Sequence, residues 1–306
     1  MRFRLTPDGP LDVPATLARY RIWGEDPANR VSGDVFRRVL RLGGRLVPYE
    51  VHGNGTVDQP RLEILAPGVR AAPVTDAITR EVRAIFGLDF DLPGFYRVAK
   101  ADPALGPLIE PLYGMRPTLA PTALEMLVGS ICAQQVNLTF AFALRARLVR
   151  RFGTPVVIGG ETVWAFPEAR ELADRRPREL RTMQFSRNKA VAIRGVARAL
   201  AAGALDPSVL AAASHAEVIA RLTALHGLGR WTADWFLARC LGRGDVCPAG
   251  DLGVRKAFAH YYGRGRVPGE QTIRRRARAW GPYQNLAIHY LLAGMRRGRP
   301  SAGGGT

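Results

Sequence analysis

The chain contains little cysteine and little lysine, and the shortage of cysteine excludes whole classes of protein. Its three cysteines, Cys132, Cys240 and Cys247, are an odd number without paired spacing, which argues against a disulfide framework and for a reducing, cytoplasmic compartment. Three cysteines also cannot supply a four-thiolate iron–sulfur cluster or a Cys₄ zinc site. Only three of the 44 basic residues are lysines, so arginine carries nearly all of the positive charge.

Long apolar runs are also absent. No run reaches the roughly 18 residues of a membrane-spanning helix. The N-terminus carries Pro7, Asp8, Pro10 and Asp12 where a signal peptide needs its apolar core. We therefore expect a soluble intracellular protein with no membrane partner. Its 306 residues, 47% of them hydrophobic, are enough for one large domain or two domains with a proper core.

Positive charge is what the sequence has in excess. Acidic residues number 26 against 44 basic ones, which gives a formal net charge of +18 at pH 7. Such a charge favours a polyanionic partner, and nucleic acid is the leading candidate because no basic amphipathic stretch flanks an apolar anchor. Codon bias in a GC-rich genome is an alternative explanation for the choice of arginine over lysine, but it does not explain the excess of basic residues.

The first third of the sequence, residues 1–98, mixes strand and turn signals. Short stretches of alternating polar and apolar residues predict antiparallel strands. The signals are a hairpin around Gly43-Gly44, a second turn over residues 52–55, a half-buried strand over 61–65 and a helix over 76–86. We expect an α+β domain with an antiparallel sheet.

From residue 99 to residue 300 the strand signals fade and helical periodicity replaces them. Apolar residues recur at i, i+3, i+4 and i+7 in three segments. Their members are Leu124, Leu127, Val128 and Ile131; Ile193, Val196, Ala197 and Leu200; and Val254, Ala257, Phe258 and Tyr261. This region is expected to be mostly helical, and the tail over 301–306 is expected to be disordered.

The segment over residues 222–236 is the most informative of the chain. A helix ending near Leu225 meets a short hairpin with Gly227 and Gly229, and a second helix begins near Arg230. Glycine permits the positive φ of a tight turn and the close approach of a backbone N–H to a phosphate oxygen. A hairpin of this kind holds a DNA backbone without reading its sequence. An ordinary connection between two helices is the alternative.

A carboxylate follows the hairpin at a fixed spacing. Asp251 lies 22 residues after Gly229, just before a predicted helix. The hairpin L-H-G-L-G-R-W-T-A-D-W with this aspartate resembles the helix-hairpin-helix DNA glycosylases, closest to the bacterial DNA-3-methyladenine glycosylase II type. On that resemblance Asp251 is the catalytic aspartate, which stabilises cationic character on the sugar and orients the attacking water. A simple helix N-cap is the alternative role, and both can coexist.

The resemblance extends over most of the chain. Residues 131–137 resemble the interhelical loop that enters the DNA, residues 183–190 the turn before the helix that precedes the hairpin, and residues 280–283 a motif of the late helix. Residues 1–98 match the family's TBP-like N-terminal domain by element order. The implied architecture is this α+β domain followed by two helical subdomains over 99–300, with the active-site cleft between them.

The resemblance also implies base flipping, which leaves a gap in the duplex. Gln135 aligns with the wedge that fills this gap, while Gln134 and Asn137 would touch neighbouring base edges. The alternative for Gln134 and Gln135 is that they cap and bridge two helices.

An aromatic pocket would receive the flipped base, because an alkylated purine carries positive charge that attracts π-faces. Trp231 and Trp235 lie one helical turn apart on one face, and Tyr283 is a candidate third member. Plain core packing is the alternative. The late helix has Leu292 where the relatives have a pocket tryptophan, so the resemblance leaves the lesion range open.

Other residues would hold the DNA backbone: Gly227, Gly229, Arg230 and Arg255. In the family, hairpin carbonyls bind a monovalent cation such as Na⁺ or K⁺, and the matching carbonyls here belong to Thr223, Leu225 and Leu228. This cation site is implied by the resemblance only. No cofactor is expected for catalysis, and no iron–sulfur cluster is expected.

Basic residues gather after Asp251, and the only acidic residues in this part of the chain are Asp251 itself and Glu270. The basic residues are Arg255, Lys256, Arg264, Arg266, Arg274, Arg275, Arg276, Arg278, Arg296, Arg297 and Arg299. A cluster of this kind supports phosphate binding that weakens with salt. Only some of these side chains are expected to touch DNA, and Arg255 is the best single candidate because it lies one turn from Asp251.

One position selects between two reaction types. Relatives that also cut the strand carry a lysine after the hairpin, which forms a Schiff base with the sugar, whereas this chain has Trp231. His226 also replaces the usual proline of the turn. The resemblance implies a monomeric, monofunctional N-glycosyl hydrolase of base excision repair that removes 3-methyladenine and 7-methylguanine from duplex DNA and leaves an abasic site. A glycosylase for deaminated or oxidised bases and a non-catalytic DNA-binding protein are the alternatives.

Overall fold

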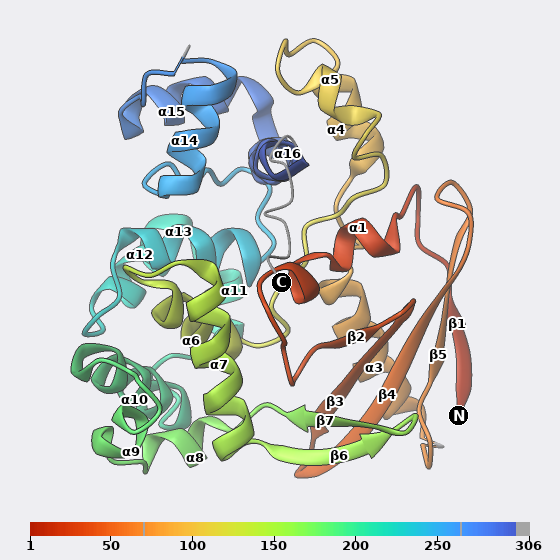
Figure 1. Ribbon diagram of the computed structural model, residues 1–306, viewed down its shortest axis with the longest axis vertical. Helices are drawn as coiled ribbons and strands as arrows, with labels where there is room; N and C mark the ends of the chain where they lie inside the picture. Colours follow the sequence, from red (N-terminus) through yellow and green to blue (C-terminus); the bar gives the residue numbers. More distant parts are fainter. Residues whose placement is uncertain (70, 264, 298–306) are drawn as a thin grey trace, which may run out of the picture.

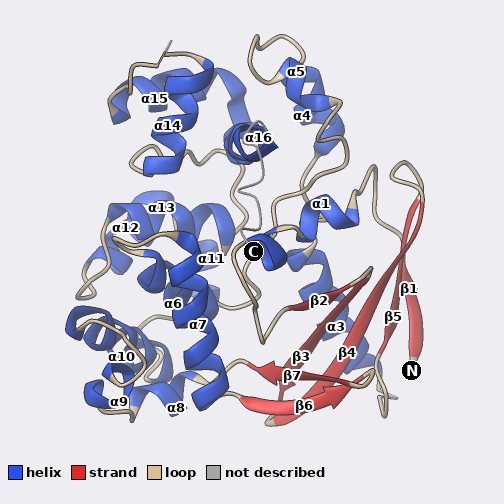
Figure 2. Ribbon diagram, in the orientation of Figure 1, coloured by secondary structure: helices blue, strands red, loops and turns tan. Residues whose placement is uncertain are grey.

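The computed structural model describes residues 1–69, 71–263 and 265–297. An antiparallel sheet forms one side of the molecule, and helices form the rest (Figures 1 and 2). This confirms the α+β class that the sequence predicts. The tail predicted to be disordered, residues 301–306, lies outside the described residues. Within the described residues, no helix combines the length and the apolar character that crossing a bilayer requires.

The N-terminal sheet has the strand order β1-β5-β4-β3-β2, and all neighbours are antiparallel. Its strands are β1 (Arg2–Leu5), β2 (Arg30–Ser32), β3 (Val35–Leu42), β4 (Arg45–Gly55) and β5 (Pro60–Leu65). Leu42 pairs with Arg45 across the predicted Gly43-Gly44 turn, and both glycines have positive φ. The predicted hairpin and the strand over 61–65 are therefore confirmed.

The turn predicted over residues 52–55 is wrong, because β4 continues through them. His52 pairs with Val35 of β3 on one side and with Glu63 of β5 on the other. Pairing with β5 continues through Gly53 and Gly55 and overrides the local turn preference of these two glycines. The strand ends at Gly55, where φ is +87°.

One helix covers the apolar face of the sheet. Helix α3 (Ala72–Ile85) buries Ile78, Val82 and Ile85 against side chains of β3, β4 and β5. The helix predicted over 76–86 is therefore confirmed, although it begins earlier. Two short helices, α1 (Val13–Leu17) and α2 (Arg19–Ile22), follow the first strand.

The helical region builds the larger hydrophobic core. Its helices are α4 (Leu92–Ala99), α5 (Gly106–Ile109), α6 (Ala123–Ala133), α7 (Leu138–Phe152), α8 (Ala169–Ala173), α9 (Pro177–Arg181), α10 (Arg187–Ala201), α11 (Pro207–Ala212), α12 (His215–Thr223), α13 (Arg230–Arg239), α14 (Leu252–Tyr261), α15 (Glu270–Ala277), the 3₁₀ helix η1 (Arg278–Tyr283) and α16 (Gln284–Arg297). The three predicted apolar faces lie on α6, α10 and α14. Helix α4 crosses the predicted domain boundary at 98/99, and its buried side chains also belong to this core.

A second, two-stranded sheet interrupts the helices. Strands β6 (Thr154–Ile158) and β7 (Glu161–Ala165) form a hairpin around Gly159-Gly160 and pack against β3 and β4 (Figure 2). The expectation that strands end with the N-terminal third is wrong at this point. The sequence does carry a local signal for this hairpin, because two glycines separate two short runs rich in β-branched residues.

Buried ion pairs join the sheet to the helices. Arg38 of β3 contacts Glu81 of α3 over 2.8 Å and also pairs with Glu125 of α6. Arg145 of α7 contacts Glu125 over 2.9 Å and also pairs with Asp26. All five side chains are at most 10% exposed. This network fixes α6 and α7, the two helices that flank the predicted DNA wedge, to the N-terminal sheet.

Candidate active site

The hairpin between α12 and α13 has one tightly packed glycine and one open glycine. Gly227 has a φ of +81°, and a Cβ atom there would lie 2.7 Å from Cβ of Ala192 in α10. Gly229 is the N-cap of α13, and a Cβ atom there would meet nothing within 4 Å. No side chain caps this helix start. The hairpin therefore presents an open helix N-terminus, which suits an anion.

Three N–H groups hold the carboxylate of Asp251. This residue is the N-cap of α14, and its Oδ1 accepts from the backbone N–H of Val254 over 3.0 Å. Its Oδ2 accepts from Nε1 of Trp231 over 2.8 Å and from Nε1 of Trp235 over 3.1 Å. Asp251 is therefore an N-cap, and its second oxygen is oriented by side chains from the helix that follows the hairpin.

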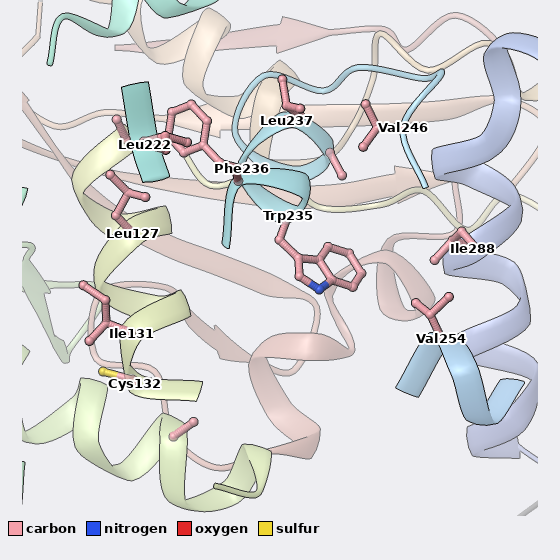
Figure 3. Packing of buried hydrophobic residues seen from close by; sticks show 14 of the residues in the cluster. Leu127, Ile131, Cys132, Leu222, Trp235, Phe236, Leu237, Val246, Val254 and Ile288 are labelled. Carbon is pink, nitrogen blue, oxygen red and sulfur yellow. The ribbon is translucent and has the colours of Figure 1, made fainter. Parts of the chain in front are cut away.

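The two tryptophans differ in their surroundings. Trp235 is 9% exposed and packs edge-to-face on the His289 ring, with 5.8 Å between ring centroids. Figure 3 shows its indole on the side of α13 that faces Val254 and Ile288. Trp231 is only partly buried. A stacking role in a base pocket stays a prediction for both, and Trp231 has the more accessible ring.

Sequence reasoning missed the indole contacts to Asp251. The available signal was chemical, because the N–H of a buried tryptophan usually finds a hydrogen-bond partner. His289 was missed as well, since a lone histidine in a helix carries no pattern. Its Nδ1 lies 2.9 Å from the Asn285 carbonyl, and its pKa is lowered to about 3, by burial first and by Arg239 second. The ring beside Trp235 is therefore neutral at physiological pH.

Tyr283 contacts a different element from the tryptophan pair. Its hydroxyl donates to Oδ2 of Asp91, the N-cap residue of α4, over 2.8 Å. Its ring lies 6.3 Å from that of Phe95. The backbone N–H of Gly94 and then this hydroxyl lower the pKa of Asp91. The structure thus ties Tyr283 to α4, and its place in a base pocket stays a prediction.

The loop between α6 and α7 carries the three predicted wedge residues in three different roles. Gln134 donates from Nε2 to the carbonyl oxygen of Gly227 in the hairpin over 2.8 Å. Gln135 is exposed and has a φ of +56°, which is rare for a residue other than glycine. Asn137 is the N-cap of α7 and accepts from the backbone N–H of Phe140 over 2.8 Å. Only Gln135 therefore has neither a capping nor a bridging contact here.

The two predicted backbone-binding arginines are placed differently. Arg230 donates from Nε to Asp234 over 2.8 Å, yet 55% of its side chain is exposed. Arg274 binds the other oxygen of Asp234 over 2.7 Å. Arg255 forms no ion pair with any described residue, and its buried Nε lacks a hydrogen-bond partner among them. Arg255 is thus the more available cation near Asp251.

Several other basic residues after Asp251 have structural partners. Arg276 lies 3.8 Å from the centroid of the Tyr262 ring and 3.5 Å from Asp102. Arg297 donates to the carbonyl of Pro111 over 2.6 Å. Arg264 and Arg299 lie outside the described residues. The basic cluster is therefore partly used for packing, and which of its members touch DNA stays a prediction.

The hairpin carbonyls named for a cation lie at the C-terminal end of α12 and in the turn. Thr223 ends the helix, and the carbonyl of Leu225 accepts from the backbone N–H of Leu228 over 3.1 Å. Carbonyls at a helix C-terminus lack intrahelical donors and carry partial negative charge. The donor chemistry therefore fits a monovalent cation. Groups of three or more metal-ligating side chains do not occur in the described part of the chain.

Comparison with known proteins places this chain among DNA repair proteins. Residues 128–282 match the family described as HhH-GPD superfamily base excision DNA repair protein. The chain is 31% identical over 216 residues to a DNA-3-methyladenine glycosylase of Bacillus subtilis (strain 168), covering 71% of each protein. It is 29% identical to a probable bifunctional transcriptional activator/DNA repair enzyme of Mycobacterium tuberculosis (strain ATCC 25618 / H37Rv), covering 92% of this chain but 55%, about half, of that protein.

A solved structure is similar over almost the whole chain. The 3-methyladenine DNA-glycosylase from Archaeoglobus fulgidus superposes with a TM-score of 0.86 at 26% identity. The match covers 97% of this chain and 99% of that one, so it includes the N-terminal sheet as well as the helices.

Proposed function

Because the chain belongs to the HhH-GPD superfamily of base excision DNA repair proteins, we propose that it is a monofunctional DNA-3-methyladenine glycosylase. It flips alkylated purines such as 3-methyladenine and 7-methylguanine out of duplex DNA, hydrolyses the glycosidic bond and leaves an abasic site. The observation that carries this proposal is the carboxylate of Asp251, held by two indole N–H donors on α13, which follows the hairpin, and by one backbone N–H of α14.

DNA is held from the hairpin side. The open N-terminus of α13 and the N–H of Gly229 receive a backbone phosphate, and Arg255 supplies positive charge one turn beyond Asp251. Gln135 fills the gap that the flipped nucleotide leaves. Cation binding by the hairpin carbonyls would add positive charge next to the same phosphate. Flipping costs a few kcal/mol, and less for a poorly stacked lesion.

The reaction breaks the bond between C1′ of the deoxyribose and the purine nitrogen. The bonding electron pair leaves with the base, so a purine that carries a positive charge from alkylation departs neutral. The sugar becomes cationic, and the negative charge of Asp251 stabilises it. Water adds its oxygen to C1′ and gives up a proton, which completes the abasic site. The indole N–H groups keep the carboxylate oriented during this step.

The base pocket is proposed to use the accessible ring of Trp231 as its aromatic wall. A cationic purine is attracted to that ring, whereas a neutral one gains only stacking. Leu292 lies beside the same site, because a Cβ atom on Gly253 would be 3.0 Å from Asp251 and 3.4 Å from Leu292. A leucine at this position is smaller than the tryptophan of the relatives, so it would leave more space for a base beside the carboxylate of Asp251.

Released-base chromatography on defined duplexes tests the proposal. Each duplex carries one lesion, and borohydride trapping is run in parallel to detect a Schiff base. We expect release of 3-methyladenine and 7-methylguanine without a trapped covalent complex, because Trp231 stands where a Schiff-base lysine would be needed. Release of hypoxanthine or oxidised purines alone would favour the second enzyme class. Salt-sensitive duplex binding without any release would favour a non-catalytic protein.

The protein is further proposed to act as a monomer on duplex DNA. Light scattering of the free protein and of its complex with one duplex would show a single chain in each.

A further inference from the structure

One side chain joins the two segments that are proposed to touch DNA. Gln134, the C-cap residue of α6, donates from its amide Nε2 to the carbonyl oxygen of Gly227 over 2.8 Å. The next residue, Gln135, is exposed and has the left-handed backbone conformation already noted. Such a conformation in a residue other than glycine persists only where the surroundings hold it. The hydrogen bond from Gln134 to Gly227 restrains the backbone next to Gln135 on the side of the loop that faces the hairpin.

Helix α10 supports both segments. Lys189 donates from Nζ to the carbonyl of Cys132, two residues before Gln134, over 2.8 Å. Ala192 packs where a Cβ atom on Gly227 would come within 2.7 Å. The base of the α6–α7 loop and the hairpin thus rest on the same helix, and Gln134 connects their exposed parts.

We propose that Gln134 is a positioning residue, which holds Gln135 at the lesion gap in register with the phosphate bound by the hairpin. This inference rests on the proposed function. The hydrogen bond to Gly227 uses one N–H of the Gln134 amide and holds this side chain against the hairpin, so Gln134 acts through the loop conformation. Gap filling and phosphate binding are thereby coupled, and a shift of the hairpin is transmitted to Gln135.

A double-mutant cycle tests the coupling. Gln134→Met keeps the length of the side chain without the donor, and Gln135→Ala removes the gap-filling group. Single-turnover base release is measured for both variants and their combination. Gln134→Met should slow release about three- to tenfold, as loss of one net hydrogen bond supports. In the Gln135→Ala background it should change release by less than about twofold. Independent, multiplicative effects would overturn the proposal.

A second measurement needs no DNA. Hydrogen exchange of the backbone amides over residues 225–230 is compared between the wild type and Gln134→Met. The proposal predicts faster exchange in the variant, because the hairpin loses its restraint. The matched control is Gln59→Met, at an exposed glutamine between β4 and β5 that should leave the hairpin unchanged. Unchanged hairpin exchange in Gln134→Met would refute the proposal, even if the wild type released no base and the proposed function failed.

Discussion

The carboxylate of Asp251 accepts from two indoles that sequence pattern alone presents as a stacking surface. Trp231 and Trp235 both donate to Oδ2, while Oδ1 caps α14. An aspartate that served only as a cap would need none of the side-chain donors. The two tryptophans therefore orient the carboxylate that we propose is catalytic, whatever part their rings play in holding a base.

Replacing the indoles by phenyl rings separates these two roles. Trp231→Phe and Trp235→Phe each keep an aromatic ring but remove one N–H donor to a charged group. Such a hydrogen bond contributes about 1.5–3 kcal/mol, so single-turnover base release should fall about ten- to hundredfold. The rates and the melting temperatures are measured together. A phenylalanine variant with the wild-type rate would show that only the ring matters.

Among single residues, the sequence predicts those that belong to a motif within one short stretch of the chain. Asp251 and the two glycines were identifiable because the hairpin and the spacing to the aspartate are features of the chain itself. The hydrogen bonds from Trp231 to Asp251 and from Gln134 to Gly227 join residues 20 and 93 positions apart. Such contacts depend on how helices pack, which periodicity does not specify.

The two glycines of the hairpin between α12 and α13 differ in backbone conformation and in surroundings. Gly227 needs a positive φ and lies against Ala192, whereas Gly229 has an ordinary backbone conformation and open space around it. The first glycine is thus required for folding of the element, and we propose that the second allows a phosphate to approach.

A matched pair of alanine variants tests this division. Gly227→Ala should lower the free energy of unfolding by about 2–4 kcal/mol, from the left-handed conformation and the overlap with Ala192 together. Gly229→Ala should change stability by less than about 1 kcal/mol, since its backbone suits alanine. It should instead weaken duplex binding, because the added methyl obstructs the backbone N–H. Equal stability of the two variants in denaturant titration would contradict this account.

Elements were predicted best where neighbouring strands did not intervene. Helices α6, α10 and α14 follow from periodicity, since each buries one face against a single core. The turn expected over 52–55 failed because β5 pairs with all four of these residues, and the β6–β7 hairpin was overlooked inside a helical region. Strand pairing is non-local, so a short window does not determine it.

At the scale of the whole molecule, buried charge connects the sheet to α6 and α7, the helices on either side of the proposed DNA wedge. Glu125 of α6 accepts from both Arg38 of β3 and Arg145 of α7, and its side chain is 3% exposed. None of these residues stood out in the sequence, because each is one of many arginines or acids. Their partners lie 87 and 20 positions away along the chain.

Removing the shared acid should destabilise the entire fold. Glu125→Gln removes one of the two acidic partners from each of two buried guanidinium groups. Loss of one partner from a comparable buried pair costs about 3–5 kcal/mol. Equilibrium unfolding in urea measures the loss. Glu110→Gln, at an exposed glutamate after α5, is the matched control and should stay within about 0.5 kcal/mol of the wild type. A small effect at Glu125 would mean that the network does not join the two parts.

If Asp251 stabilises the cationic sugar, its loss should show in single-turnover release of 3-methyladenine by Asp251→Asn. The matched control is Asp206→Asn, at the N-cap of α11. Asparagine caps a helix about as well as aspartate, so each change should alter stability by less than about 1 kcal/mol, which melting temperatures will check. We predict at least a hundredfold slower release, of the order seen when one transition-state stabilising group is lost, with duplex affinity within about threefold. Release at the wild-type rate by a folded, DNA-binding Asp251→Asn protein would contradict the account.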